Sequence, residues 1–252
     1  ITTRHDSHAR MVCDALRAGK HVFVEKPLAL TTEQLLEITA AYEQTRSTSN
    51  APQLMVGFNR RFAPQIQKMK TLLKSVSEPK VFVMTVNAGA IPVDHWTQDK
   101  EVGGGRMIGE GCHFIDLLRY LAASEIIQTT GMMIGSGPGI AIRNDKISFN
   151  LQFADGSMGT VHYLANGHKS FPKERLEVFC AGRILQLDNF RQLRGYGWPK
   201  FTSMKLWRQD KGQKICAQEF IAAIEKSLPC PIAFDELHQV TDVSIELATK
   251  FS

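Results

Sequence analysis

The first sixty residues alternate between short apolar runs and amphipathic stretches, and this alternation constrains the fold more than any other feature of the chain. The runs at 21–25 and 53–58 are apolar without a break, as in strands covered on both faces. The stretches at 7–19 and 31–41 carry apolar residues at helical spacing. With a strand-like start at 1–3, the order predicts parallel strands joined by crossover helices.

Local signals predict where these helices begin and end. Ser7 is placed as the N-cap of the first helix, and Gly19 as the left-handed residue after its last turn. Thr31 and Gln34 have the spacing of a capping box at the start of the second helix. Residues 47–51 are polar and predict a loop before the next strand.

Beyond residue 59 the alternation gives way to strands in succession, with helices before and after them. Predicted helices cover residues 64–73, 107–121, 217–226 and, capped by Asp235, 236–250. Predicted strands cover residues 80–87, 126–134, 146–153, 158–164, 175–180, 184–188 and 192–196, with hairpin signals at Asp155-Gly156 and Ala181-Gly182. The expected fold class is therefore α/β plus α+β: a parallel unit in residues 1–60, then a domain in residues 61–252 with a large, mainly antiparallel open sheet and flanking helices.

Charge, hydropathy and cysteine usage exclude several classes of protein. The net charge is +5, yet there is no run of five like charges, which disfavours a nucleic-acid tail. A mildly basic surface also suits anionic small molecules such as nucleotides or sugar acids. No apolar run reaches the ~18 residues of a membrane span. The five widely spaced cysteines contain no Cys-x-x-Cys, so we expect neither disulfides nor a metal site, and a reducing, cytoplasmic location.

The predicted strand 21–25 ends on Glu25-Lys26-Pro27, a polar cluster at its carboxyl end. In open α/β sheets ligands bind at the carboxyl ends of the strands, so this carboxylate and ammonium are candidates for chemistry. An exposed salt bridge before a loop is the plain alternative.

Four motifs, in this order, carry a resemblance to a known family. They are Thr3 with His8-Ala9 and Ala15-Leu16-x-Ala18-Gly19-Lys20-His21-Val22; Glu25-Lys26-Pro27; Gly57-Phe58-Asn59-Arg60-Arg61-Phe62; and Gly103-Gly104-Gly105 through Gly111-x-His113-x-x-Asp116. Over essentially its full length the chain resembles the glucose–fructose oxidoreductase, inositol dehydrogenase and MocA-type family of NAD(P)-dependent oxidoreductases. The segments 153–157 and 171–175 are similar to a subgroup whose dehydrogenase unit is the C-terminal part of a longer bi-domain polypeptide.

The resemblance implies a Rossmann domain whose glycine-rich strand–turn–helix is not found at the start of this chain. Residues 1–60 then correspond to the C-terminal part of that domain, with roughly a hundred residues expected upstream. The glycine cluster at 135–139 has the wrong spacing and predicts a loop between strands. The implied cofactor is NAD or NADP, with weak or absent binding expected for these 252 residues alone. The residue that selects between the two cofactors would lie upstream.

The family pattern implies roles for the polar cluster and for one histidine. Lys26 would contact substrate and the nicotinamide ribose, Glu25 would position the cofactor, and a cis bond would precede Pro27. His113 matches the catalytic histidine, and its near-neutral pKa suits acid/base work. A surface ion pair for Lys26 and a packed helix histidine are the structural alternatives.

The chain departs from the family pattern four residues before His113. An aspartate is usual there, and this chain has Gly109, with Glu110 one position later. One position on a helix is a rotation of about 100°, so Glu110 replaces the aspartate as a catalytic group only if the helix begins irregularly. The other possibilities are altered chemistry and lost activity.

Further site residues follow from the same resemblance. Thr3, His5 and His8 would lie in the loop beside the cofactor, and a metal site from His5, His8 and Cys13 is disfavoured. The expected substrate-binding residues are Asn59, Arg61, Trp96 and Asp116. For Trp96 a loop anchored by the indole is an equal alternative, and Arg60 is expected to be solvated.

Together these patterns predict an oxidoreductase acting on a hydroxyl of a sugar, nucleotide sugar or cyclitol. Lys26 would orient the substrate and His113 would move the proton. The alternative is a catalytically degenerate sugar-binding or assembly module with the same fold, which Gly109 favours. The resemblance implies a homo-dimer or homo-tetramer joined through the open sheet, and no nucleic-acid or membrane partner is expected.

Overall fold

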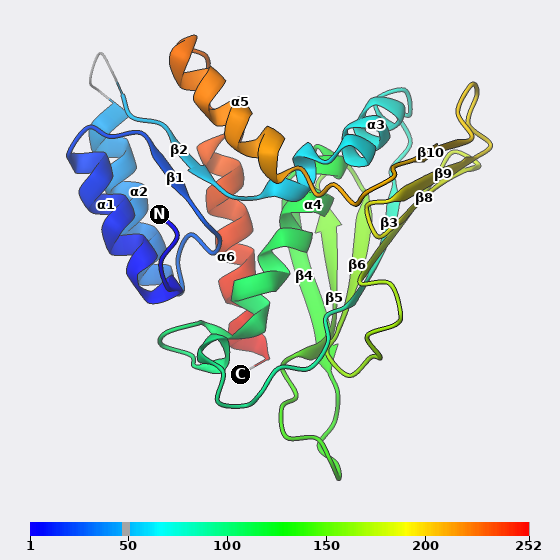
Figure 1. Cartoon of the computed structure of the whole chain (residues 1–252), viewed down its shortest axis with the longest axis horizontal. Coiled ribbons are helices and arrows are strands. Elements are labelled where there is room, and N and C mark those ends of the chain that lie inside the picture. Colours follow the sequence, from blue (N-terminus) through cyan, green and yellow to red (C-terminus); the bar gives the residue numbers. More distant parts are fainter. Residues whose placement is uncertain (47–50, 252) are drawn as a thin grey trace.

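Two sheets of different size organise the protein, which a computed structural model describes over residues 1–46 and 51–251 (Figure 1). The small sheet and its helices occupy one side of the molecule, and the large sheet occupies the other. Apart from Ala51, the polar loop expected at 47–51 lies outside the described residues.

The small sheet pairs β1 (Val22–Val24) with β2 (Leu54–Val56) in parallel, with Phe23 opposite Met55. Helix α2 (Thr32–Arg46) connects these two strands, and helix α1 (His8–Arg17) precedes β1 and packs against β1 and α2, so the predicted parallel unit is confirmed. The strand predicted at 1–3 is wrong. The amino group of Ile1 donates to the carbonyl of Phe23 at 2.7 Å, but residues 1–3 are not assigned to any strand.

The helix ends follow the predictions in part. Gly19 has φ +67° after the last turn of α1, as expected. Ser7 is the N-cap residue of α1, as predicted, but its side chain makes no capping hydrogen bond, because its hydroxyl donates to the Arg4 carbonyl at 2.8 Å. The capping box forms with one partner shifted by one residue. The backbone N–H of Gln34 donates to Thr31 Oγ1 at 3.2 Å, and the side-chain oxygen Oε1 of Gln34 accepts from the backbone N–H of Leu30, not of Thr31, at 2.8 Å.

Among the described residues the large sheet has eight strands in the order β10-β9-β8-β7-β3-β6-β5-β4. Their bounds are β3 Val81–Asn87, β4 Ile126–Met133, β5 Lys146–Phe153, β6 Met158–Leu164, β7 Glu174–Cys180, β8 Arg183–Asp188, β9 Gln192–Tyr196 and β10 Ser203–Lys205. Only the central β3–β6 pair is parallel, so the mainly antiparallel sheet is confirmed. The short edge strand β10 was not predicted.

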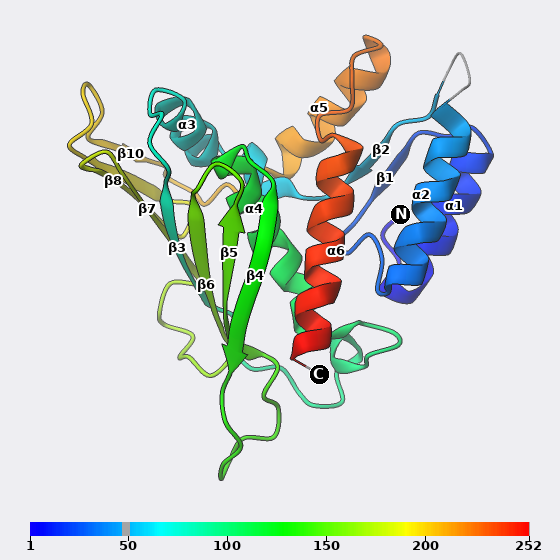
Figure 2. The same ribbon diagram turned by 180° about the vertical axis from the view of Figure 1, so that it is seen from behind.

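Helices cover one face of this sheet and leave the other face open (Figure 2). The remaining helices are α3 (Pro64–Leu73), α4 (Cys112–Ala122), α5 (Gln213–Glu225) and α6 (Phe234–Lys250). The strands show the matching pattern: in β5, Phe149 and Leu151 are buried while Asn150 and Gln152 are exposed. The alternation places one continuous hydrophobic core under the helices.

Helix α6 packs against both sheets, and helix α5 contacts the small sheet. Helix α6 contacts α2 and β2 on one side and α4 and β4 on the other (Figures 1 and 2). The rings of Tyr42 and Phe234 stack with centroids 3.9 Å apart, and Phe23 contacts Phe220 at 5.8 Å. The cap predicted at Asp235 is wrong, since Ala233 is the N-cap and Asp235 lies in the first turn. No helix in residues 1–46 or 51–251 is long and apolar enough to cross a membrane.

Candidate active site

The polar cluster after β1 touches the segment that begins α4. Lys26 Nζ donates to the backbone carbonyl of Gly109 at 2.6 Å, and Lys26 is partly exposed. The peptide bond between Lys26 and Pro27 is cis, as the family resemblance implies. The end of one parallel strand and the start of the long helix therefore meet at a single point.

His113 lies in the first turn of α4, close to this meeting point. Its side chain is 7% exposed, and the edge of its ring faces Phe58 with centroids 6.1 Å apart. Nδ1 has no hydrogen-bond partner among the described residues. Burial, together with the nearby cations Arg60, Lys26, Lys211 and Lys173, holds the pKa of His113 well below its usual value. The imidazole is therefore neutral at ordinary pH.

The start of this helix is irregular, as a catalytic role for Glu110 would require. Met107–Gly111 forms a π-helical turn. Within it Glu110 pairs with Arg106 at 2.8 Å and with Lys173 at 3.8 Å. These contacts direct the carboxylate toward the large sheet, whereas Lys26 is bound by a backbone carbonyl. A catalytic role for Glu110 stays a prediction.

The histidine His5 fills the space beside Gly109. A Cβ at position 109 would lie 3.2 Å from Cε1 of His5. The His5 ring is held by a 2.8 Å hydrogen bond between Nδ1 and the Gly103 carbonyl and by an edge contact with Trp96, at 4.8 Å between centroids. Burial lowers the pKa of His5 to about 4. An aspartate at 109 would require this ring to move.

The other residues expected beside the cofactor support the loop around Lys26. His8 is fully buried, and its Nδ1 lies 2.8 Å from the Pro27 carbonyl. Its Nε2 lies 3.2 Å from the Thr3 carbonyl. Thr3 Oγ1 hydrogen-bonds Ser7 Oγ at 2.7 Å on the surface. These contacts hold the loop in place, and contact of Thr3, His5 and His8 with a cofactor stays a prediction.

Arg61 and Asp116 bind each other within the fold. Arg61 is 3% exposed and donates to Asp116 at 2.5 and 3.2 Å and to Glu236 at 2.8 Å. Asn59 donates to the Lys211 carbonyl at 2.7 Å, and Trp96 packs on His5. The structure gives each of these expected substrate-binding residues an internal partner. Their contact with a substrate stays a prediction.

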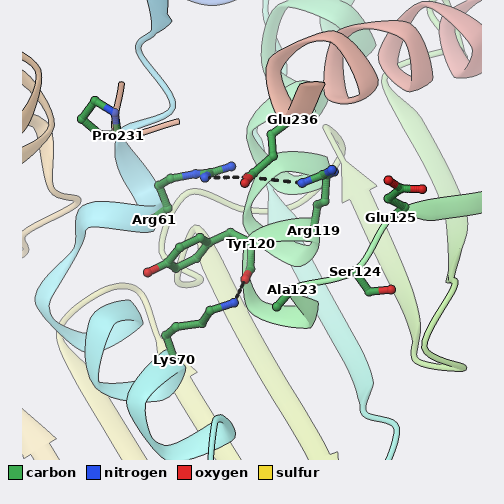
Figure 3. Close-up of a pocket in the computed structure, with 9 residues that line it drawn as sticks. All are labelled: Arg61, Lys70, Arg119, Tyr120, Ala123, Ser124, Glu125, Pro231 and Glu236. Carbon is green, nitrogen blue, oxygen red and sulfur yellow. Dashed lines mark hydrogen bonds and ion pairs between the residues drawn. The ribbon is translucent and has the colours of Figure 1, made fainter. Parts of the chain in front are cut away.

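Arg61 lines a pocket at the other end of α4 from His113. This pocket of about 430 Å³ also includes Glu236 and Arg119, which pair at 3.3 Å, and Lys70, which donates to the Tyr120 carbonyl (Figure 3). The pocket lies beside the C-terminal turn of α4, whereas His113 lies in the first turn of that helix.

Among the described residues no group of three or more His, Cys, Asp or Glu side chains could hold a metal ion.

Two further groups near His113 were missed by the sequence analysis. Glu174 is 1% exposed and accepts from Arg60 at 2.8 and 2.9 Å and from Lys211 at 2.5 Å. Burial would raise the pKa of Glu174, but Arg60 and Lys211 hold it below its usual value. The expectation that Arg60 is solvated is therefore wrong, because a buried carboxylate from β7 binds it. The motif at 171–175 includes Glu174, but nothing in that motif indicates that Glu174 would bind Arg60.

Tyr163 is the second group. The side chain is fully buried, and its hydroxyl has no hydrogen-bond partner among the described residues. Burial and the neighbouring Glu110 carboxylate raise the pKa of Tyr163. Its strand β6 carries it under the π-helical turn, where the Arg106 guanidinium lies over its ring at 5.4 Å.

Comparison with known proteins agrees with this architecture. Residues 1–51 match the sequence model described as an oxidoreductase family with an NAD-binding Rossmann fold, and residues 66–185 match that of the GFO/IDH/MocA C-terminal domain. An inositol 2-dehydrogenase from Rhizobium meliloti is 27% identical over 90% of this chain and 69% of its own length. A myo-inositol 2-dehydrogenase from Thermotoga maritima is also 27% identical, over 76% of this chain and 56% of its own length.

A solved structure shows the same fold. It is a levoglucosan dehydrogenase in complex with NADH and levoglucosan, with a TM-score of 0.81 and 23% identity, matched over 99% of this chain and 77% of that one. The match supports the arrangement of the two sheets.

Proposed function

Because this chain belongs to the GFO/IDH/MocA family of NAD(P)-dependent oxidoreductases, we propose that the protein transfers a hydride between NAD(P) and a hydroxyl-bearing carbon of a sugar, nucleotide sugar or cyclitol. One observation carries the proposal. Lys26 Nζ lies 2.6 Å from the Gly109 carbonyl, which brings a cation to the helix that presents the buried, neutral His113. A neutral imidazole can accept the hydroxyl proton in alcohol oxidation, and a nearby cation can stabilise the developing alkoxide.

The residues around Lys26 fit the nicotinamide end of the cofactor. A Cβ at Gly57 would lie 3.1 Å from the Glu25 carboxylate, so glycine at the end of β2 leaves room for that side chain. Nδ1 of His113 is buried and has no hydrogen-bond partner among the described residues. When bound, the cofactor supplies the hydride acceptor or donor. The residues that would hold it are Thr3, His5, His8, Glu25 and Lys26.

Lys26 and His113 divide the work on the substrate hydroxyl. The Lys26 ammonium stabilises the negative charge that develops on the oxygen as its proton leaves. The His113 imidazole accepts that proton, since its lowered pKa keeps it in the basic form. In the reverse direction His113 returns the proton to the carbonyl oxygen. The site therefore performs oxidation and reduction with the same two groups.

A second function is favoured by one observation. Gly109 replaces the family's aspartate, and the Lys26 ammonium is bound by the carbonyl of that residue, with no carboxylate in the described contacts. Loss of the carboxylate beside Lys26 is expected in a sugar-binding or assembly module that no longer catalyses a reaction. Only the oxidoreductase would turn over substrate, so an activity measurement separates the two functions.

Reduction of NAD⁺ or NADP⁺ by a panel of sugars and cyclitols tests the proposal. With the purified full-length protein we expect absorbance of the reduced nicotinamide to rise with at least one member of the panel. Saturable binding of the same compounds without any reduction would favour the binding module instead.

We also propose that the open face of the large sheet joins two or four copies of the chain. Val81 is opposite Met158 in β6 and Phe179 in β7, and all three are exposed. Neighbouring strands thus place a contiguous apolar patch on the face without helices. Exposed apolar surface of this kind marks protein–protein contacts.

The double substitution Met158→Lys and Phe179→Lys is expected to convert a dimer or tetramer into monomers, because it puts like charges into the contact. Light scattering coupled to size exclusion would measure the molecular mass. The matched control is Ile221→Lys, an exposed apolar residue on α5. A wild-type monomer, or a mass unaffected by the double substitution, would contradict this arrangement.

The compartment is part of the same proposal. All five cysteines, including the partly exposed Cys230, are free thiols. Free thiols persist in reducing surroundings, which favours a cytoplasmic location.

A further inference from the structure

The buried His113 imidazole lies among cations from separate segments of the chain. Lys26 follows β1, Arg60 lies in the 3-10 turn Asn59–Phe62, and Lys173 and Lys211 precede β7 and α5. Burial is the largest influence on the His113 pKa, and after it these four cations all act to lower it. The positive charge therefore converges on the residue expected to handle the substrate proton.

The carboxylates beside these cations are too few to balance them. Glu174 accepts two hydrogen bonds from Arg60, at 2.8 and 2.9 Å, and one from Lys211, at 2.5 Å. The side chain of Glu174 is 1% exposed and that of Lys211 is 16% exposed, so solvent screens this group weakly. One carboxylate serves two cations, which leaves one positive charge.

The second carboxylate is shared in the same way. Glu110 pairs with Arg106 at 2.8 Å and with Lys173 at 3.8 Å. Lys26 is bound by the uncharged Gly109 carbonyl. In these contacts five cations share two carboxylates.

Two other carboxylates of the described residues, those of Asp116 and Glu25, do not offset this excess. Asp116 is already paired with the Arg61 guanidinium, and Glu25 has an exposed side chain. An oxidised nicotinamide ring is itself cationic, so it adds to the positive charge. Around the buried side chains of His113, Arg60 and Glu174, charge of one sign is unfavourable unless an opposite charge joins it.

We propose that the substrate is a sugar or cyclitol that bears an anionic group, a carboxylate or a phosphate, which Lys173 and Lys211 bind while a hydroxyl of the same molecule lies against Lys26 and His113. This inference rests on the proposed function. Lysine suits either anion, because its ammonium is a point charge without the fixed fork of arginine. Lys173 is the more accessible of the two, with a side chain 46% exposed.

Calorimetric titrations with matched ligand pairs test the inference. The pairs are glucose with glucuronate, glucose with glucose 6-phosphate, and myo-inositol with myo-inositol 1-phosphate, each added to the purified protein. We expect the better anionic member to bind at least about tenfold more tightly than its neutral partner, with the difference shrinking as salt is added. The carboxylate and phosphate members distinguish the two anions.

The substitution Lys173→Gln should lower the affinity for the anionic member about tenfold and leave the neutral member unaffected. Lys173→Arg should restore it, because the charge returns. The control is Lys169→Gln, an exposed lysine in the same loop, which should change neither affinity. A merely structural role for Lys173 would weaken both members together.

Several outcomes overturn the inference. They are equal or tighter binding of the neutral members, no binding of any anionic member, and a Lys173→Gln effect that is the same for both members of a pair. Turnover reports separately on the proposed function. Selective binding of anionic ligands without nicotinamide reduction would contradict hydride transfer and leave the recognition of an anionic group standing. Nicotinamide reduction with neutral substrates only would support hydride transfer and contradict the recognition of an anionic group.

Discussion

Replacing Lys26 with alanine is expected to lower kcat for nicotinamide reduction by about 1000-fold, the usual effect of removing a group that stabilises a developing oxyanion. Lys26 is partly exposed, and its ammonium is bound by the Gly109 carbonyl, with no carboxylate in the described contacts. The substitution therefore leaves no buried charge unpaired, and the fold should persist. Steady-state kinetics with the best substrate of the panel measure the loss, and circular dichroism checks the fold.

The matched control is Lys20→Ala, an exposed lysine just before the same strand. It removes the same charge from the same unit and should leave kcat unchanged. A Lys26→Ala protein with wild-type turnover would mean that the cation after β1 takes no part in the chemistry.

His113→Gln is expected to lower kcat by about 100- to 1000-fold, because an amide cannot accept the substrate proton. The pH dependence gives a second readout. His113 must be neutral to act as a base, and its pKa lies well below the usual 6.5. The value of kcat should therefore stay constant from neutral pH to below pH 6.5, and it should fall only as the pH drops through the lowered pKa of His113.

The fall of kcat at low pH, the acid limb of the pH profile, should disappear from the residual activity of His113→Gln. His168→Gln, on an exposed loop, is the control and should preserve both kcat and the acid limb. An acid limb centred near 6.5 in the wild type would contradict a buried neutral base, and so would an unchanged kcat in His113→Gln.

Much of the fold could be predicted because local patterns determine it. Unbroken apolar runs indicated β1 and β2, and alternation indicated the strands of the large sheet. The capping signals were less reliable: Ser7 is the N-cap residue of α1 but its hydroxyl donates to the Arg4 carbonyl, and Asp235 lies inside α6. Side-chain oxygens at a helix start have several possible partners, and tertiary contacts choose among them. The three-residue strand β10 is too short for any periodicity to indicate.

The candidate site was predicted where a motif is local. Glu25-Lys26-Pro27 and the helix of His113 could be found because each is a short segment with a recognisable order. An irregular start of that helix was named only as the condition under which Glu110 could replace the missing aspartate. The π-helical turn at Met107–Gly111 meets that condition.

Long-range pairs were not predictable in this way. Glu174 meets Arg60 across 114 positions in the chain, and His5 meets the Gly103 carbonyl across 98. Spacing carries no information on such contacts, because the fold alone brings the segments together. The same holds for Arg61, whose partner Asp116 was expected to bind substrate.

Transfer of deuterium is the most direct measurement of hydride transfer at the Lys26–His113 site. Sugars, sugar acids and cyclitols labelled with deuterium at their hydroxyl-bearing carbons would be incubated with the full-length protein and oxidised cofactor, and the nicotinamide would be analysed by mass spectrometry. We predict one deuterium on the nicotinamide ring with the wild type and about 1000-fold slower labelling with Lys26→Ala. Labelling that is as fast with Lys26→Ala, or no labelling by the wild type across the whole panel, would contradict it.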